Sequence, residues 1–348
     1  NLVDYQIKKT VIHSDVRFTY QKAQDVIDNK EGELVTELLL LDKLSKILRK
    51  TRQNKGSINF ESTEVKFILD KDNNPIDVYF KESLSTNHLI EEFMLLANKT
   101  VAKHIGFPKK EAKTFVYRIH DIPDVDRITT LNNIVKKFGH SIDNTSTPKL
   151  SSSLNSLLKN VKGKKEQQMV ETLTIRSMAK AVYTTNNIGH YGLAFDYYSH
   201  FTSPIRRYPD LIVHRLLEQY IDGGKSANQE EIEKVCKHCS EMEKVASTAE
   251  RDSIKYMQVK FLKNKIGEIF EGVISGVTEW GLYIEITENK CEGLVKVSSI
   301  KDDHYIYDEK KYALIGYRTK VSYQLGQKVK VKVQRADLER KQMDFILV

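Results

Sequence analysis

The chain has 348 residues, 40% hydrophobic and 29% charged, which is enough to build a sizeable core and suggests about two domains. Its 55 lysines and arginines exceed 47 aspartates and glutamates, giving a formal charge of +8 that favours an acidic partner. Three cysteines are too few for a disulfide framework, and the sequence shows neither an apolar run of membrane-helix length nor a hydrophobic signal region. We therefore expect a soluble, cytoplasmic protein.

Up to about residue 265 the sequence predicts mainly long helices. Helical hydrophobic patterns cover residues 21–50, 87–105, 166–183, 204–220 and 229–264. Between the first two helices, "GSINFESTEVKFILDKDNNPIDVYFKES" alternates in hydrophobicity and turns at residues 72–75, which predicts a pair of strands. Residues 140–165 are rich in Ser, Thr, Asn and Lys, which favours a polar, mobile connection.

After residue 265 the pattern changes to short β segments with glycine at the turns. Five such segments follow one another, among them "GLYIEIT" and "QKVKVKVQRADLERKQMDFILV". Short strands of this number and spacing predict a small closed barrel of the OB type. We therefore expect an α+β fold with two domains, residues 1–264 and a five-stranded OB-fold β-barrel over residues 265–348.

The predicted helix 87–105 carries two adjacent glutamates that project in different directions. Its apolar stripe consists of Ile90, Met94, Ala97, Val101 and Ile105. Glu91 lies at the edge of this stripe and Glu92 points away from it, so we expect Glu91 to be half buried and to need a partner. An ordinary boundary glutamate would explain the same position. Glu250, beside small residues of the helix 229–264, is open to the same two interpretations.

Two short motifs raise the question of a metal site. "CKHC" gives Cys236, His238 and Cys239 a ligand-like spacing, yet both cysteines fall on the apolar stripe of a continuous helix and no second pair follows. "HDIPDVD" groups three aspartates that would suit a hard cation, and a turn that caps the next helix explains them as well. We assign no metal ligand to either motif.

The segment "SHFTSPIRRYPDLIVHR", residues 199–215, places adjacent arginines beside core-like residues. Pro204 suits the first position of a helix, and Pro209 requires that the helix be kinked or begin again. Arg206 near a helix N-terminus offers a guanidinium fork that matches phosphate. The alternative is an ion pair between Arg206 and Asp210 that braces a charged corner.

The barrel region places aromatic and cationic residues on segments that share a face in a five-stranded barrel. Trp280 and Tyr283 lie at a strand start, and Lys296, Arg335 and Arg340 fall on neighbouring segments. Aromatic rings interleaved with cations suit the stacking of unpaired bases and the neutralisation of a phosphate backbone. The alternative is that the rings belong to the core and the cations to an ordinary solvated surface.

Several blocks carry a resemblance to a known family. "HYGLAFDYYSHFTSPIRRYPDLIVHRLL" (190–217), "STAERD" (247–252) and "IEEFMLLAN" (90–98) resemble the RNB family of ribonuclease II and ribonuclease R, and the arginine pair is more similar to ribonuclease R. The C-terminal region resembles the RNA-binding OB fold of the ribosomal-protein-S-one type. The resemblance implies a processive 3'-to-5' exoribonuclease that hydrolyses single-stranded RNA with magnesium and releases nucleoside 5'-monophosphates.

The resemblance also implies roles for five residues of the first domain. Arg206 would stabilise charge on the scissile phosphate, and Glu250 would lie near the 3'-terminal nucleotide. Phe60 would form one half of an aromatic clamp on the terminal base. Tyr20 and Glu91 would contact the sugar, where the 2'-hydroxyl distinguishes RNA from DNA.

In the barrel the resemblance implies four RNA contacts. Trp280 and Tyr283 would stack on bases, and Arg340 would contact a phosphate. Lys296 would also face RNA, although it stands where many relatives have histidine. We expect single-stranded RNA as the partner, with no membrane and no obligate protein partner.

The sequence departs from the family in one respect that concerns catalysis. The family holds magnesium with an aspartate cluster, Asp followed after six positions by Asp-x-Asp-Asp, and no such cluster occurs in these 348 residues. Without these ligands the hydroxide nucleophile is not generated. We therefore expect a C-terminal piece of an exoribonuclease that binds RNA but is catalytically incomplete. The alternative is a natural, non-catalytic RNA-binding protein.

Overall fold

The computed structural model describes residues 2–58, 64–81, 83–107, 112–164, 166–309 and 311–348. The chain divides into two compact units. The smaller unit comprises residues 1–49 and 83–93, and the larger comprises residues 50–82 and 94–348. In the described part of the chain, no helix combines the length and the hydrophobicity needed to cross a membrane.

Three helices contribute to the smaller unit: α1 (Tyr20–Asn29), the first part of α2 (Val35–Asn54) and the start of α3 (Ser85–Gly106). The single helix expected over residues 21–50 is therefore divided into α1 and α2. The chain turns between them through left-handed conformations at Lys30, Gly32 and Leu34, with Gly32 at φ +117°. A glycine suits this turn because L side chains rarely adopt such a φ.

The larger unit contains the rest of the helices and two small β pairs. The helices are α4 (Val125–Val135), α5 (Thr147–Val161), α6 (Gln167–Ser177), α7 (Tyr208–Ile221) and α8 (Gln229–Lys263). The antiparallel hairpin β1 (Glu64–Leu69) and β2 (Pro75–Lys81) confirms the predicted strand pair. A second antiparallel pair joins β3 (Tyr117–Ile119) to β4 (Val182–Thr184).

The prediction of a mobile connection over residues 140–165 is wrong, because α5 occupies most of it. Leu150, Leu154, Leu157 and Val161 are buried along one side of α5, which is the i, i+4, i+7, i+11 pattern of a helix that packs on a core. Most of the serines and lysines lie on its outer surface, although Ser151 is buried. Pro148 stands in the first turn of α5, where the missing N–H costs no hydrogen bond.

The C-terminal region confirms the predicted five-stranded closed barrel. Its strands are β5 (Ile269–Thr278), β6 (Gly281–Ile286), β7 (Glu292–Lys296), β11 (Lys328–Asp337) and β12 (Gln342–Leu347), in the order β11-β12-β7-β6-β5. β12 and β7 pair in parallel and the other neighbours pair antiparallel. Buried and less buried positions alternate along β6 and β7, as the two faces of a strand require.

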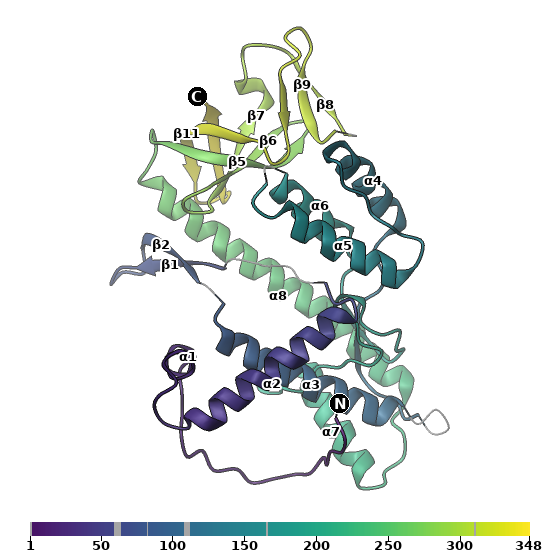
Figure 1. Ribbon diagram of the computed structural model, residues 1–348. Coiled ribbons are helices and arrows are strands. Elements are labelled where there is room, and N and C mark those ends of the chain that lie inside the picture. Colours follow the sequence, from purple (N-terminus) through teal and green to yellow (C-terminus); the bar gives the residue numbers. More distant parts are fainter. Residues whose placement is uncertain (1, 59–63, 82, 108–111, 165, 310) are drawn as a thin grey trace. The chain divides into compact units, whose positions relative to one another are not determined.

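A second sheet within this region was not anticipated from the sequence. Strands β8 (Tyr305–Asp308), β9 (Ala313–Gly316) and β10 (Ser322–Gln324) form an antiparallel sheet in the order β10-β9-β8. It is inserted in the chain between β7 and β11 of the barrel (Figure 1).

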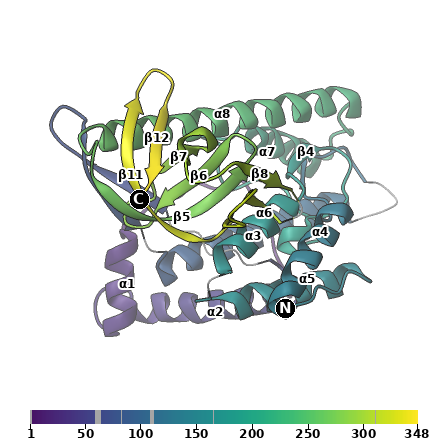
Figure 2. The same cartoon turned by 90° about the horizontal axis from the view of Figure 1, so that it is seen from above.

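The C-terminal part of the long helix α8 packs against the barrel, and the rest of the helix extends away from it (Figure 1; seen from above in Figure 2). The Lys255 ammonium of α8 donates to the Glu292 carbonyl at 2.7 Å, and the Gln258 amide donates to the Lys290 carbonyl at 2.9 Å. A continuous hydrophobic core extends from α4, α5 and α6 through the end of α8 into the barrel interior. This packing fixes the residues of α8 against the rim of the barrel.

Candidate functional site

The segment before α7 forms a tight turn in which the side chain of one arginine, Arg207, pairs with a buried carboxylate. The Asp210 side chain is fully buried, and its Oδ1 accepts hydrogen bonds from the Ser203 N–H and from Arg207 Nη2, each at 2.8 Å. The alternative expectation of an Arg206–Asp210 pair is therefore wrong, because Arg207 is the partner. Pro204 lies in this turn and α7 begins only at Tyr208, so the helix starts later than predicted.

Arg206 is exposed on the same turn. Its N–H donates to the Ser203 carbonyl at 3.3 Å, as the Arg207 N–H does at 3.0 Å. No ion pair joins Arg206 to any carboxylate of the described residues. A guanidinium on a fixed backbone with its fork toward solvent is suited to bind an anion.

We call residues 199–210 the arginine corner, and contacts from two other segments hold it. The Ser199 hydroxyl donates to the Val116 carbonyl at 2.6 Å, and the Phe201 N–H donates to Asn98 Oδ1 at 3.0 Å. His214 of α7 donates from Nε2 to the Phe201 carbonyl at 2.8 Å, and the two rings stack with centroids 4.2 Å apart. Neither end of the corner is free to rearrange without breaking these bonds.

Imidazole and phenol rings pack within the arginine corner and beside it. The His200 ring lies with its centroid 5.6 Å from that of Tyr183, whose hydroxyl is 2.8 Å from His200 Nδ1. Burial, followed by the positive charges of Arg207 and Arg118, lowers the pKa of His200 to about 3. Burial also lowers the pKa of His190 to about 3. Both rings are neutral near pH 7, so they support the corner by packing and hydrogen bonding rather than as cations.

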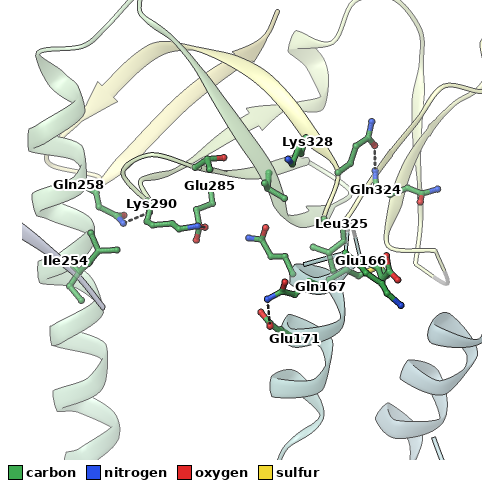
Figure 3. A pocket seen from close by; sticks show the side chains of 18 of the residues that line it. Glu166, Gln167, Glu171, Ile254, Gln258, Glu285, Lys290, Gln324, Leu325 and Lys328 are labelled. Atoms are coloured by element: carbon green, nitrogen blue, oxygen red, sulfur yellow. Dashed lines mark hydrogen bonds and ion pairs between the residues drawn. The ribbon is translucent and has the colours of Figure 1, made fainter. Parts of the chain in front are cut away.

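Glu250 lines a cleft of about 1530 Å³ in the larger unit. The cleft lies between β1, the start of α6, the middle of α8 and the adjacent edge of the barrel region (Figure 3). Charged, amide and apolar side chains all line the part drawn in Figure 3, where Gln167 donates to Glu171 at 2.8 Å and Gln258 to the Lys290 carbonyl at 2.9 Å. The cleft wall therefore combines polar and charged groups with apolar side chains such as Phe67, Ile254 and Met257.

Tyr20 and Glu91 both belong to the smaller unit. The Thr86 hydroxyl of α3 donates to the Tyr20 carbonyl at 3.1 Å, which joins the starts of α1 and α3. Glu91 Oε2 lies 3.3 Å from His88 Nδ1, and the Glu91 side chain is 43% exposed. Glu92, expected to point away from the protein, is buried at 3% exposure. Glu91 is thus half buried beside a partner, as expected, whereas the expectation for Glu92 is wrong. The predicted apolar stripe was misplaced, because Ile90 and Met94 are 42% and 38% exposed while Leu89 and Leu95 are buried.

Phe60, the expected half of the aromatic clamp, lies outside the described residues. Within the larger unit, Arg206 and Glu250 stand on separate elements, and no hydrogen bond or ion pair of the described residues joins them.

The barrel brings three of its four candidates together. Trp280 is 55% exposed, and its Nε1 lies 3.5 Å from the Tyr283 hydroxyl. Lys296 pairs in register with Gly281, directly after Trp280. The Lys296 ammonium, however, makes a 3.0 Å ion pair with Asp344 of β12. We call the surface formed by Trp280, Tyr283, Lys296 and Asp344 the barrel face.

Arg340 stands in the turn between β11 and β12 and is exposed. Its N–H donates to Asp337 Oδ1 at 3.0 Å, and this bond is the largest cause of a lowered pKa for Asp337. Arg335, in contrast, makes a 2.6 Å ion pair with Asp337. The Asp337 carboxylate thus pairs with the side chain of Arg335 and accepts a hydrogen bond from the backbone of Arg340.

Sequence reasoning did not single out one further row of cations. Lys328, Lys330 and Lys332 alternate along β11 with its inward valines, and all three are exposed. Within the described part of the chain none of them forms an ion pair, and Lys328 also lines the cleft (Figure 3). The repeat "KVKVKV" was the available signal, because a period of two places all three lysines on one side of a strand.

The two possible metal motifs have structural explanations. Asp124 caps α4, with its Oδ1 accepting from the Arg127 N–H at 2.9 Å. Cys236 and Cys239 are buried, and burial raises the pKa of Cys236 to about 12, which keeps it a thiol and not the thiolate that binds zinc. Among the described residues, no group of three or more His, Cys, Asp or Glu side chains is arranged to hold a metal ion. The residues described here therefore do not fit the magnesium that the family resemblance implies.

Known proteins align with this chain throughout its length. The ribonuclease R of Thermotoga maritima is 40% identical over 369 residues, and that of Aquifex aeolicus 37% over 362 residues; each match covers 100% of this chain and 50% of the relative. The solved Mycoplasma genitalium RNase R in complex with ribose-methylated single-stranded RNA matches with a TM-score of 0.87 and 28% identity, over 95% of this chain and 53% of that one. The chain thus spans about half the length of the curated relatives it matches.

Family models account for both regions of the chain. The model of the RNB domain matches residues 1–223, which is more than half of the chain, and the model of the S1 RNA binding domain matches residues 263–347. The chain therefore belongs to the RNB family, is homologous to bacterial ribonuclease R along its whole sequence, and ends in an S1 RNA-binding domain.

Proposed function

We propose that this chain binds single-stranded RNA as part of a ribonuclease R-type 3'-to-5' exoribonuclease, an enzyme that releases nucleoside 5'-monophosphates processively with the help of magnesium. The relative that is bound to single-stranded RNA supports the choice of ligand. We also propose that the two domains meet near residue 264, close to where the S1 match begins.

The observation that carries the proposal is the barrel face. Trp280, the single tryptophan of the chain, is more than half exposed, which is unusual for so large an apolar side chain. A large exposed ring beside Tyr283 gives a platform for unpaired bases, and aromatic stacking accepts any base because every base has a π-face. Exposed Arg340 supplies a charge for the backbone close to the same strands.

Arg206 supports the same ligand from the first domain. Arg207 is held by buried Asp210, whereas Arg206 is exposed on the same turn. We propose that Arg206 contacts a phosphate of the RNA and that Glu250 faces the strand from the wall of the cleft. We propose further that Tyr20 and Glu91 contact ribose and that Phe60 stacks on the terminal base.

Hydrolysis does not follow from the described residues. They hold no cluster that would bind magnesium, and magnesium would supply the activated water in such a reaction. The proposal for this chain is therefore RNA binding, and cleavage is proposed only for the whole enzyme. A non-catalytic RNA-binding protein is the second candidate, favoured by the same lack of a described metal cluster.

The test is the affinity for a fluorescently labelled single-stranded RNA of about 16 nucleotides, a length within the span of one OB fold and its neighbours. We expect binding that weakens as salt rises, since lysine and arginine contacts release counterions from the phosphates. Trp280→Ala should weaken binding about tenfold, because a base–aromatic stack contributes about 1–3 kcal/mol. Tyr79→Ala, which removes an exposed tyrosine of β2, is the matched control and should leave the affinity unchanged.

An affinity that does not change between low and moderate salt would contradict the proposal. For catalysis, labelled RNA is incubated with magnesium, and we expect no shortening by this chain. Robust magnesium-dependent shortening by homogeneous protein would show that this chain binds a catalytic metal without a cluster of the kind sought among the described residues. It would also exclude the non-catalytic alternative.

A further inference from the structure

The loop between β9 and β10 is built around a buried carboxylate. Asp303 Oδ2 accepts from the Arg318 N–H at 2.9 Å, from the Thr319 N–H at 2.6 Å and from the Thr319 hydroxyl at 2.7 Å. The Asp303 side chain is 0% exposed. These hydrogen bonds, led by the one from the Thr319 backbone, lower the pKa of Asp303 well below its ordinary value.

The backbone of residues 316–320, the 316–320 loop, is held at further points. The Gly316 N–H donates to the Val321 carbonyl and the Tyr317 N–H to the His304 carbonyl, both at 2.8 Å. A Cβ on Gly316 would lie 2.5 Å from Thr319 Oγ1 and 2.7 Å from Asp303 Oδ2, so only glycine fits beside the carboxylate. The loop is therefore fixed in one conformation although it lies at the surface.

The side chains that this loop presents are an aromatic ring and two cations. Tyr317 is 64% exposed, and the Arg318 side chain is 77% exposed although its Nε lies 3.5 Å from Asp303 Oδ1 in an ion pair. The Lys320 ammonium donates to the Tyr317 carbonyl at 2.8 Å and lies 5.5 Å from the centre of the Tyr317 ring. With Ile306 and Ile315, Tyr317 and Lys320 line a shallow hollow of about 490 Å³.

A single exposed tyrosine is common on protein surfaces and indicates nothing by itself. Here the ring is combined with two cations, and a buried, ionised carboxylate holds the backbone that carries them. Side chains on a fixed backbone lose less conformational entropy when a ligand binds, so such a loop is prepared for recognition. The positive charges select a negatively charged ligand, and the ring selects one with flat, unpaired bases.

We propose that the 316–320 loop is a second contact of the S1 domain with single-stranded RNA, in addition to the barrel face. Tyr317 stacks on an unpaired base, and Arg318 and Lys320 contact the phosphates on either side of it. This proposal rests on the RNA binding proposed above. It adds a contact that is separate from the barrel face and from Arg340.

The test compares Tyr317→Ala and the double variant Arg318→Ala, Lys320→Ala with Trp280→Ala, in titrations of the labelled single-stranded RNA. Tyr317→Ala should weaken binding about 5- to 20-fold, within the range of one lost base stack. The double variant should also weaken binding and should reduce the steepness of the salt dependence by up to about 1.4, because each of the two single-strand phosphate contacts contributes about 0.7. Tyr79→Ala is again the matched control.

A further variant tests whether the fixed conformation matters. Asp303→Ala keeps Tyr317, Arg318 and Lys320 but removes the acceptor that holds their backbone, so it should weaken RNA binding several-fold. Circular dichroism and the thermal transition establish that each variant is folded. Because Tyr317 and Arg318 are exposed, their replacement does not disturb the core.

The outcomes separate the two proposals. If Trp280→Ala weakens binding and the Tyr317 and Arg318/Lys320 variants stay within twofold of the parent, the loop is not an RNA contact and the proposed function stands. If the parent chain does not bind single-stranded RNA at all, the proposed function fails and this inference fails with it. Weakened binding by both sets of variants, with an unchanged Tyr79→Ala control, supports both.

Discussion

The arginine corner and the barrel face differ in whether their exposed cation is paired with a carboxylate. In the corner, buried Asp210 takes Arg207 and the neighbouring Arg206 is exposed. On the barrel face the exposed lysine, Lys296, is already paired with Asp344, while the aromatic ring of Trp280 is exposed. The corner therefore offers charge from a rigid support, and the barrel face offers mainly stacking.

Under the proposed function, the two regions would contact different parts of a single RNA strand. A guanidinium recognises one phosphate with defined geometry. Aromatic stacking tolerates any base and allows the strand to be exchanged or shifted. The predictions below test this comparison, beginning with the largest expected effect.

The adjacent arginines should differ most in their effect on stability. Arg207→Ala leaves Asp210 buried without its cation, which should lower the free energy of unfolding by about 3 kcal/mol. Arg206→Ala removes an exposed side chain and should change it by less than about 0.5 kcal/mol. Urea unfolding of both variants provides the measurement. Equal losses would mean that Arg206 also supports the fold and is not reserved for a ligand.

The lysines of β11 should contribute long-range charge and not stability. Replacing Lys328, Lys330 and Lys332 by glutamine should lower RNA affinity about tenfold at low salt and reduce the salt slope by up to about 2. The measurement is the affinity at several salt concentrations. Replacing three exposed lysines of α8, Lys234, Lys237 and Lys244, is the matched control. An equal effect of both triple variants would show that only net charge matters.

The neutral histidines in the corner and beside it should make stability depend on pH. The pKa of His200 is about 3 in the folded protein and near 6.5 in an unfolded chain, so the unfolded state binds more protons between these values. Stability is therefore full above about pH 6.5 and falls as the pH decreases, by at most about 2 kcal/mol for His200 at pH 5. Unfolding curves at both pH values should show a smaller decrease for His200→Gln.

His13 provides the control for this effect, because its side chain is 87% exposed. His13→Gln should leave the pH dependence of unfolding as it is in the parent chain. If His200→Gln and the parent lose the same stability between pH 7 and about pH 5, His200 does not titrate as its burial requires.

The smallest effect is expected at Asp344. Asp344→Asn releases Lys296 for a phosphate and should raise RNA affinity about two- to threefold, in keeping with an exposed ion pair of about 0–1 kcal/mol. The gain should disappear when Lys296→Ala is combined with it. Asp143→Asn, which breaks a 3.7 Å pair with Lys149 on another element, is the control. An increase with the control variant would reflect net charge alone.

Local patterns predicted the elements whose hydrophobic period is long or regular. The helix expected over residues 229–264 corresponds to α8, and the alternating segments after residue 265 form the five-stranded barrel. The failures occurred where composition was taken as evidence of disorder, as in α5, or where a turn interrupts an apolar run, as between α1 and α2. The sheet β8-β9-β10 escaped notice because its strands have only three or four residues.

At the candidate site, residue types were predictable but their partners were not. The long motif around Arg206 and the aromatic pair Trp280 and Tyr283 were recognisable in the sequence, whereas the exposure of Trp280 was left open. The choice of Arg207 as the partner of Asp210 depends on the turn at residues 203–207, where the chain is not yet helical. The alternative ion pair between Arg206 and Asp210 required both residues to lie on one face of a continuous helix. It does not form because the helix begins only at Tyr208.

The sequence by itself determined the family, the α+β architecture and the kinds of side chain available for RNA, because periodicity and long motifs are local properties of a chain. Only the tertiary structure decided which of two adjacent residues is buried, Glu92 and not Glu91, and which is paired, Arg207 and not Arg206. Burial and pairing depend on what other segments pack against a residue. That information is distributed over the whole chain, as Asp303 and the 316–320 loop illustrate.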